Sequence, residues 1–148
     1  MRIRAPAKVN LTLEVLKLRD DSYHEIRSIL QTIDLCDELE LDESKKLEFL
    51  CDKQELNNEE NLAVRALKLS QKKMGITKTV RIRLKKFIPV AAGLGGGSSD
   101  AAAVLKGLNM LWGLDLSADR LMEIAAELGS DVPFFIQGGT ALARGRGE

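Results

Sequence analysis

The sequence predicts a single domain of the mixed α+β class, in which a sheet and several helices form two layers. Residues 8–16 and 80–85 alternate between apolar and polar side chains as strands do, whereas residues 62–74 and 99–112 have helical composition and spacing. With 148 residues, of which 45% are hydrophobic, the chain has enough apolar material for a sizeable core. The predicted order is strands, helix, strand, glycine-rich loop, helix, helix, and a strand that begins at residues 140–143.

The N-terminal third is predicted to be β-structure. Residues 8–16 alternate as a half-buried strand does, and this pattern puts Lys8 and Asn10 on one polar face. The opposite, apolar face carries Val9, Leu11, Leu13 and Val15. After a polar turn, apolar side chains over residues 29–41 predict two further strands, and residues 47–51 predict another.

Start and stop signals delimit three helices. Asn58 is the expected N-cap of the first helix, and Gly75 is expected to end it. The second helix follows the glycine-rich loop and is expected to close at Gly113 in a left-handed conformation. Ser117 is the expected cap of the third helix, which Gly129 ends.

The composition excludes several classes of protein. Lys plus Arg and Asp plus Glu both total 22, so no excess of positive charge predicts a nucleic-acid or anionic-membrane partner. Two cysteines without a paired spacing and a single histidine are too few for a zinc site, and we expect no metal held by protein ligands alone. No apolar run has membrane-spanning length, and the charged first residues have no apolar segment of the signal-peptide type behind them, so we expect a cytoplasmic protein.

The segment over residues 89–100 carries the clearest chemical signal. It reads PVAAGLGGGSSD, so four glycines and two serines lie between a strand and a helix. Glycine lets consecutive N–H groups form a concave anion site, and the following helix adds unpaired N–H donors and the positive end of its dipole. The spacing matches neither a Walker A motif nor a dinucleotide-binding fingerprint. A flexible connector is the alternative, and the alanine-rich helix directly after the loop argues against it.

Four segments resemble motifs of one enzyme family. Residues 89–103 resemble the second conserved motif of the GHMP kinases, which wraps the phosphates of ATP without a Walker lysine. The expanded form, GLGGGSSDAA, is similar to the diphosphocytidyl-methylerythritol kinase branch. Residues 5–13, 21–25 and 129–135 resemble three further motifs of that branch, although Ser22 stands where its members generally have glycine.

The resemblance implies a fold and an activity. The fold is the ribosomal-protein-S5-domain-2-like fold of the GHMP kinase N-terminal domain. The activity is phosphorylation of the 2-hydroxyl of 4-diphosphocytidyl-2-C-methyl-D-erythritol, with ATP as donor and Mg²⁺ as its companion ion, in the non-mevalonate route to isoprenoids. Family members continue into a C-terminal domain, so we expect residues 1–148 to be a truncated N-terminal ATP-binding part with weak or no turnover.

The same resemblance assigns roles to individual residues. It makes Lys8 and Asp131 catalytic and places Asn10 beside the acceptor, where an ammonium and a carboxylate can stabilise charge and take a proton. It assigns recognition of the cytosine ring to Tyr23 and His24. The residues that it places around ATP are Asn61, Lys86, Pro89, Val90, Ala91, Ala92, Gly93, Leu94, Gly95, Gly96, Gly97, Ser98 and Ser99.

Each single residue also has a purely structural interpretation. Taken alone, Lys8 and Lys86 are consistent with exposed strand lysines, and Asp131 with a turn that leads into a proline. Asn61 is equally consistent with the start of a helix. Two alternative functions remain at this point: another GHMP kinase of the mevalonate or homoserine type, and a non-catalytic module of the same fold that binds RNA or protein.

Overall fold

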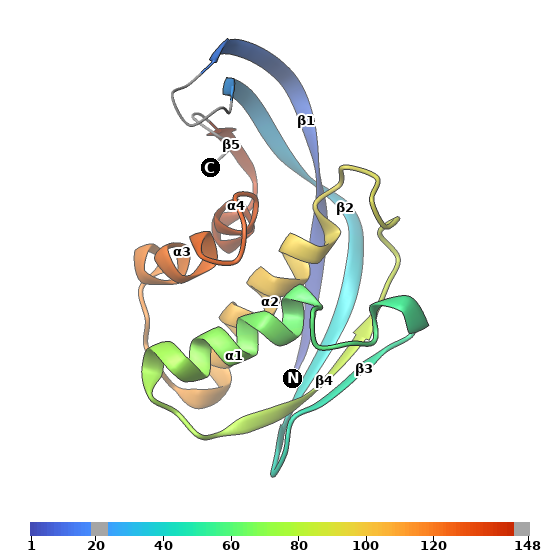
Figure 1. The fold of residues 1–148 in the computed structure, drawn as a ribbon, viewed down its shortest axis with the longest axis vertical. Coiled ribbons are helices and arrows are strands. Elements are labelled where there is room, and N and C mark those ends of the chain that lie inside the picture. The colour runs from blue at the N-terminus through green and yellow to red at the C-terminus, as the bar shows by residue number, and fades with distance from the viewer. Residues whose placement is uncertain (19–23, 144–148) are drawn as a thin grey trace.

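The computed structural model describes residues 1–18 and 24–143, with the side chains of residues 16–18 and 24–26 excepted. It is a mixed α+β domain in which the helices gather on one side of a curved sheet (Figure 1), as the sequence predicts. The elements in chain order are β1 (Arg2–Leu18), β2 (His24–Ser44), β3 (Glu48–Cys51), the 3₁₀ turn η1 (Gln54–Leu56), α1 (Leu62–Met74), β4 (Thr79–Lys85), α2 (Gly96–Trp112), α3 (Ala118–Ala126), α4 (Val132–Gln137) and β5 (Thr140–Ala143).

The sheet is organised around the long strand β2. Its strand order is β1-β2-β4-β3, and β5 pairs with the first part of β2. The pairs β1–β2, β2–β4 and β2–β5 are antiparallel, whereas β3 and β4 run parallel. One strand therefore links the end of the sheet that carries β5 to the end that carries β4.

Residues 29–41 form one strand, not the two that the sequence pattern predicts. The pairing with β1 passes from Pro6 opposite Cys36 to Lys8 opposite Thr32, so β2 contains extra residues at 33–35. This irregularity breaks the apolar alternation without ending the strand, because pairing resumes on both sides of it. Here a break in the apolar alternation does not mark the end of a strand.

A bulge in β1 overturns a second prediction. Asn10 lies opposite Leu30, but Thr12 lies opposite Ile29, so Leu11 is an extra residue in β1. A shift of one residue moves the following side chains to the other face of a sheet. The apolar residues beyond the bulge are consequently more than half exposed: Leu11, Leu13 and Val15.

The helix boundaries agree with most of the expected caps. Gly75 and Gly113 close α1 and α2 with φ of 63° and 61°, and the Ser117 side chain caps α3. The N-cap of α1 is Asn61, not Asn58, since the Asn61 side chain accepts from the Ala63 N–H at 3.0 Å. Two further differences concern lengths, because α2 begins at Gly96 and α3 ends at Ala126.

Small side chains allow α2 to lie close to the sheet. Ala101, Ala102 and Ala103 are buried in the core, and Gly107 faces the side chains of Ile3 and Leu41. Because α2 packs closely on the sheet, the position in space of its first turn is fixed. That beginning is the end of the glycine-rich loop, so core packing positions the loop.

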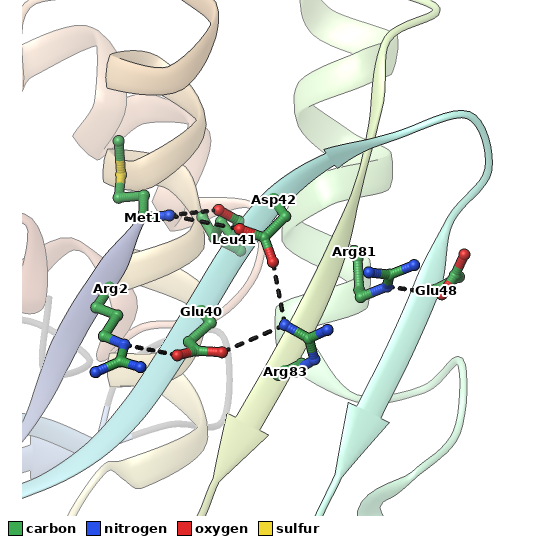
Figure 2. Close-up of polar contacts among 8 residues, drawn as sticks. All are labelled: Met1, Arg2, Glu40, Leu41, Asp42, Glu48, Arg81 and Arg83. Carbon is green, nitrogen blue, oxygen red and sulfur yellow. Dashed lines mark hydrogen bonds and ion pairs between the residues drawn. The ribbon is translucent and has the colours of Figure 1, made fainter.

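The face of the sheet away from the helices carries a ladder of alternating charges. Figure 2 shows the Arg2 side chain beside Glu40, which also lies 3.3 Å from Arg83, and shows Arg81 beside Glu48 on β3. The Met1 ammonium donates to the Leu41 carbonyl at 2.8 Å. These pairs are partly or largely exposed, and ion pairs in contact with solvent stabilise a fold only weakly. Within the described ranges, 1–18 and 24–143, no helix has the length and apolar character needed to cross a bilayer.

Replacing Gly107 by alanine tests the close approach of α2. A Cβ at this position would lie 2.5 Å from Cδ1 of Ile3 and would also collide with Leu41, which is fully buried. The gain in helix propensity is about 1 kcal/mol, and overpacking costs about 1–3 kcal/mol. We expect Gly107→Ala to lower the free energy of unfolding by about 1 kcal/mol, measured by urea denaturation. Gly129→Ala is the control, because its Cβ meets only Val132 at 3.6 Å, and equal stability of the two variants would contradict the packing argument.

Candidate active site

A cavity of about 550 Å³ lies where the glycine-rich loop meets the start of α2. Its walls come from β1, the segment before α1, the loop and the start of α4. The residues that line it are Lys8, Leu56, Glu60, Asn61, Leu62, Lys86, Pro89, Val90, Ala91, Ala92, Gly93, Leu94, Gly95, Gly96, Gly97, Ser98, Asp100 and Asp131. Residues from three of the four motifs thus share one cavity, together with Asn61 and Lys86.

The loop enters α2 in a form suited to an anion. Gly95 is the N-cap with φ of 70°, and no side chain caps the helix. Gly93 and Ala91 also have positive φ, of 74° and 58°. The N–H groups of the first turn of a helix lack internal partners and carry the positive end of the helix dipole. The cavity therefore offers backbone donors where the sequence predicts a phosphate site.

Two contacts hold this loop against the rest of the domain. The Lys8 N–H donates to the Leu94 carbonyl at 2.9 Å, which attaches the loop to β1. A Cβ on Gly95 would lie 2.8 Å from Cζ of the Phe135 ring and 3.2 Å from Cγ of Lys8. Only a glycine fits at position 95, because the loop backbone lies directly on the Phe135 ring and the Lys8 stem.

Lys8 and Asp131 form the polar centre of the cavity. The Lys8 ammonium lies 3.6 Å from the Asp131 carboxylate and donates to Oδ1 of Asn10 at 2.7 Å. Asn10 in turn donates to the Ser28 hydroxyl at 2.8 Å, and Ser28 donates to the Thr12 carbonyl at 2.6 Å. The chain of hydrogen bonds fixes the ammonium in place, and Lys8 is 7% exposed, not solvated.

The fold leaves the Asp131 carboxylate available. Asp131 is the N-cap of α4, but its side chain makes no capping hydrogen bond, and about a third of it is exposed. The other end of α4 is held by Lys106 of α2, whose ammonium donates to the Phe135 carbonyl at 2.9 Å. Burial lowers the pKa of Lys106. An anchored helix thus presents a carboxylate that can bind a ligand or take its proton.

Asn61 serves the helix and the cavity together. Its Oδ1 caps α1, its amide donates to the Leu56 carbonyl at 3.0 Å, and it lines the cavity. Both interpretations that the sequence left open are therefore compatible with its position.

Lys86 is buried, which excludes the exposed strand lysine that the sequence left open. Its ammonium donates to Asp37 and, at 2.7 Å, to Asp100. Burial raises the pKa of Asp100 to about 7, against the opposing effect of Lys86. The two carboxylates also raise the pKa of Lys86 above its usual value, although burial alone lowers it. Lys86 lines the cavity, but its charge already has two partners.

Two buried residues near the site were not selected from the sequence. Two others that were selected lie wholly or partly outside the described residues. Asp37 and Ser28 were not singled out, yet both are fully buried. Asp37 stands at a core-facing position two residues before Leu39, and an acidic residue at such a position is a signal that could have been read. Tyr23 lies outside the described residues, and of His24 only the backbone, opposite Leu18, is described. Over residues 1–18 and 24–143 no cluster of three or more acidic, cysteine or histidine side chains could hold a metal ion.

Comparison with known proteins places the fold and the cavity in one family. The family described as GHMP kinases N terminal domain matches residues 61–139, which include the loop and Asp131. The chain therefore belongs to the GHMP kinase family. The resemblance that the sequence motifs indicated and the expected N-terminal-domain fold are both confirmed.

Two relatives from different organisms bear the name of the same enzyme. The chain is 53% identical to the 4-diphosphocytidyl-2-C-methyl-D-erythritol kinase of Bacillus cereus (strain B4264), over 99% of this chain and 52% of the relative. It is 53% identical to the enzyme of the same name from Dehalococcoides mccartyi (strain ATCC BAA-2100), over 100% of this chain and 52% of the relative. The chain thus spans about half the length of these relatives.

Solved structures agree on the fold. A crystal structure of 4-(cytidine 5'-diphospho)-2C-methyl-D-erythritol kinase superposes with a TM-score of 0.89 at 45% identity, covering 100% of this chain and 53% of that one. The mevalonate kinase of Methanococcus jannaschii superposes with a TM-score of 0.74 at 18% identity, covering 100% and 54% of the two chains. The second similarity shows the fold alone.

Two glycines separate the effect of packing from that of backbone strain. Gly93 and Gly95 both have positive φ, but a Cβ on Gly93 would meet nothing within 4 Å. Alanine in the left-handed region costs about 1–2 kcal/mol at either position, and only Gly95→Ala adds a collision with Phe135. We expect Gly95→Ala to lose about 1–3 kcal/mol more unfolding free energy than Gly93→Ala, measured by urea denaturation. Equal losses would show that the loop does not lie tightly on the ring.

The pKa of Asp100 predicts a dependence of stability on pH. The pKa is 3.8 for an ordinary Asp and about 7 in the fold, so the folded chain holds a proton that the unfolded chain releases. Stability from this group is present at low pH and is lost as the pH rises towards 7. Lys86, Asp37 and the Cys51 thiol are the titratable groups that act on it.

Asp100→Asn removes this titration and keeps the shape of the side chain. Between pH 5 and pH 7 the parent should lose stability relative to Asp100→Asn, by at most roughly 1 kcal/mol per pH unit. Denaturation with urea across this pH range measures the difference. The exposed Asp34 provides the control, since Asp34→Asn should follow the parent. Parallel curves for the parent and Asp100→Asn would contradict the predicted protonation.

Proposed function

We propose that this chain is the ATP-binding and catalytic N-terminal part of a kinase that phosphorylates the 2-hydroxyl of 4-diphosphocytidyl-2-C-methyl-D-erythritol. One observation carries the proposal: Lys8 and Asp131 meet 3.6 Å apart in the cavity that the glycine-rich loop lines. The identity of 53% to relatives that bear this kinase name supports the choice of acceptor. The proposed activity is that of a full-length enzyme. The relatives with this kinase name are about twice as long as this chain.

The site residues divide the work of phosphoryl transfer. The oxygen of the acceptor hydroxyl attacks the γ-phosphorus of ATP, the bond from that phosphorus to the β–γ bridging oxygen breaks, and ADP leaves. Asp131 accepts the hydroxyl proton, and Lys8 stabilises the charge that develops on the attacking oxygen. Asn10 keeps the Lys8 ammonium in place through its hydrogen bond of 2.7 Å. Catalysis of this kind depends mainly on positioning and on charge stabilisation.

The triphosphate binds to the loop and to the first turn of α2. Backbone N–H groups over residues 95–98 supply neutral donors there, and Lys86, Asn61 and the residues before the loop border the nucleotide. A bound Mg²⁺ would be held by phosphate oxygens of the nucleotide and by the Ser98 hydroxyl, since Ser98 lines the cavity. When bound it supplies neutralisation of the phosphate charge.

On the acceptor side, we assign recognition of the cytosine ring to Tyr23 and His24. The partners are accordingly small molecules, with neither nucleic acid nor membrane among them, and the expected location is the cytoplasm.

Neutral variants of the polar centre test the mechanism. Lys8→Met keeps the stem that packs on Gly95, and Asp131→Asn keeps the shape of the carboxylate. We expect each to lower kcat at least about a hundredfold and to change ATP affinity little, because neither residue supplies the loop donors. The surface variant Glu123→Gln should retain the parent rate.

The assay compares residues 1–148 alone with a chimaera that continues into the C-terminal half of the Bacillus cereus relative. ATP-dependent phosphorylation is measured with 4-diphosphocytidyl-2-C-methyl-D-erythritol, mevalonate and homoserine. We expect turnover of the cytidyl substrate by the chimaera and weak or no turnover by residues 1–148. Turnover of mevalonate or homoserine instead would identify another kinase of the family, and no turnover of any acceptor by the chimaera would favour a non-catalytic module.

A further inference from the structure

Three ionisable side chains lie buried behind the loop. The Lys86 ammonium, from the end of β4, contacts Asp37 of β2 and Asp100 of α2. Their side chains are 4%, 0% and 2% exposed, so none of the three is solvated. Burying charges is costly unless they are paired, and truncating one member leaves the others without compensation. Such a group is therefore rigid as long as it is complete.

The two carboxylates are bound unequally. Asp37 accepts from the N–H groups of Phe87 and Ile88, at 2.6 Å and 2.9 Å, in addition to Lys86. Among the residues that the structure describes, Asp100 accepts only from Lys86, and its Oδ1 has no partner. A proton shared by this pair of carboxylates therefore falls on Asp100. Asp37 is the fixed point of the group, and Asp100 is the neutral end that α2 contributes.

The group holds both ends of the loop. Asp37 binds the backbone at Phe87 and Ile88, directly before Pro89, and Asp100 lies in the second turn of α2, directly after Ser99. Between these ends, a Cβ on Gly96 would lie 3.2 Å from the Lys86 nitrogen. The first turn of α2 thus lies on the Lys86 ammonium. Any movement of that turn relative to the sheet must break a contact of Lys86.

We infer that Lys86, Asp37 and Asp100 act together as a positioning clamp, which fixes the N–H donors of the phosphate loop by tying α2 to β2 and does not itself bind phosphate. The inference rests on the proposed function only in taking a nucleoside triphosphate as the ligand.

Electrostatics predicts opposite changes in nucleotide affinity for a clamp and for a lysine that binds phosphate directly. If Lys86 bound phosphate directly, the neighbouring carboxylates would compete with the phosphate for it and repel the nucleotide. Removing either carboxylate would then strengthen binding or leave it unchanged. If the group is a clamp, removing the hydrogen bond to Lys86 releases α2 and weakens binding, although a group that competes with phosphate for Lys86 has also been removed.

Asp100→Ala and Asp100→Asn form a matched pair. Both remove the same ionisable group, but only asparagine retains an oxygen that accepts from Lys86. Isothermal titration with the non-hydrolysable analogue AMP-PNP and Mg²⁺, on residues 1–148, measures the affinity of each. Amide hydrogen exchange over residues 95–100 measures the order of the loop. We expect Asp100→Ala to bind at least tenfold more weakly with faster exchange, and Asp100→Asn to bind within threefold of the parent.

Equal or tighter binding by Asp100→Ala, with unchanged exchange, would overturn the clamp. Should Asp100→Ala fail to fold, Asp37→Asn replaces it, because its amide turns a donor towards Lys86 while its oxygen still accepts from Phe87 and Ile88. This variant should also bind at least tenfold more weakly, and tighter binding would overturn the inference. If the parent binds no AMP-PNP, the proposed function fails, and the exchange rates over residues 95–100 still decide whether the clamp orders the loop.

Discussion

The contact of Gly95 with the Phe135 ring and the Lys8 stem is the constraint on which the site depends. It joins three elements that are distant in sequence: β1, the loop before α2, and α4. Because the loop backbone lies on the ring, the N–H donors of the loop, the Lys8 ammonium and the Asp131 carboxylate at the start of α4 have fixed relative positions. A side chain at position 95 would separate the donors from the charged pair, so packing and chemistry cannot be changed independently here.

The sheet contributes a second constraint through the bulge at Leu11. Lys8 and Asn10 precede the bulge; Lys8 lines the cavity, and Asn10 links the Lys8 ammonium to the buried Ser28 hydroxyl. An uninterrupted strand would instead have kept Asn10, Thr12 and Glu14 on one face. The bulge ends the polar stripe after Asn10 and puts Leu13 on the same face, opposite Ser28. An apolar side chain therefore borders the polar centre on this strand.

Local sequence signals were sufficient to predict much of the fold, and motif resemblance predicted most of the residues that line the cavity. The strict alternation over β4 and the glycines after α1 and α2 predicted these elements, because periodicity and left-handed caps are local properties. Lys8, Asp131 and the loop were brought together by resemblance and do line one cavity.

The features that could not be predicted are those that depend on pairing across the fold. The continuity of β2 and the bulge in β1 are set by register, which no single strand encodes. The choice of Asn61 over Asn58 as N-cap depends on the 3₁₀ turn that precedes α1, because Asn61 also binds the Leu56 carbonyl. Asp37 was recognisable as an acidic residue in a core-facing position, but its partners became clear only when β2, β4 and α2 were placed side by side.

The charges around the cavity determine which groups can bind a polyphosphate. Two ammonium groups, on Lys8 and Lys86, face four carboxyl groups, on Asp37, Glu60, Asp100 and Asp131, so the side chains provide no net positive charge. A proton on Asp100, whose pKa is about 7, does not make the balance positive. The attraction for phosphate that the proposed function requires must therefore come from the N–H dipoles of the loop and of α2. Neutral dipoles bind phosphate well only when they are held in a fixed direction, so a site of this composition requires a rigid loop more than it requires additional charge.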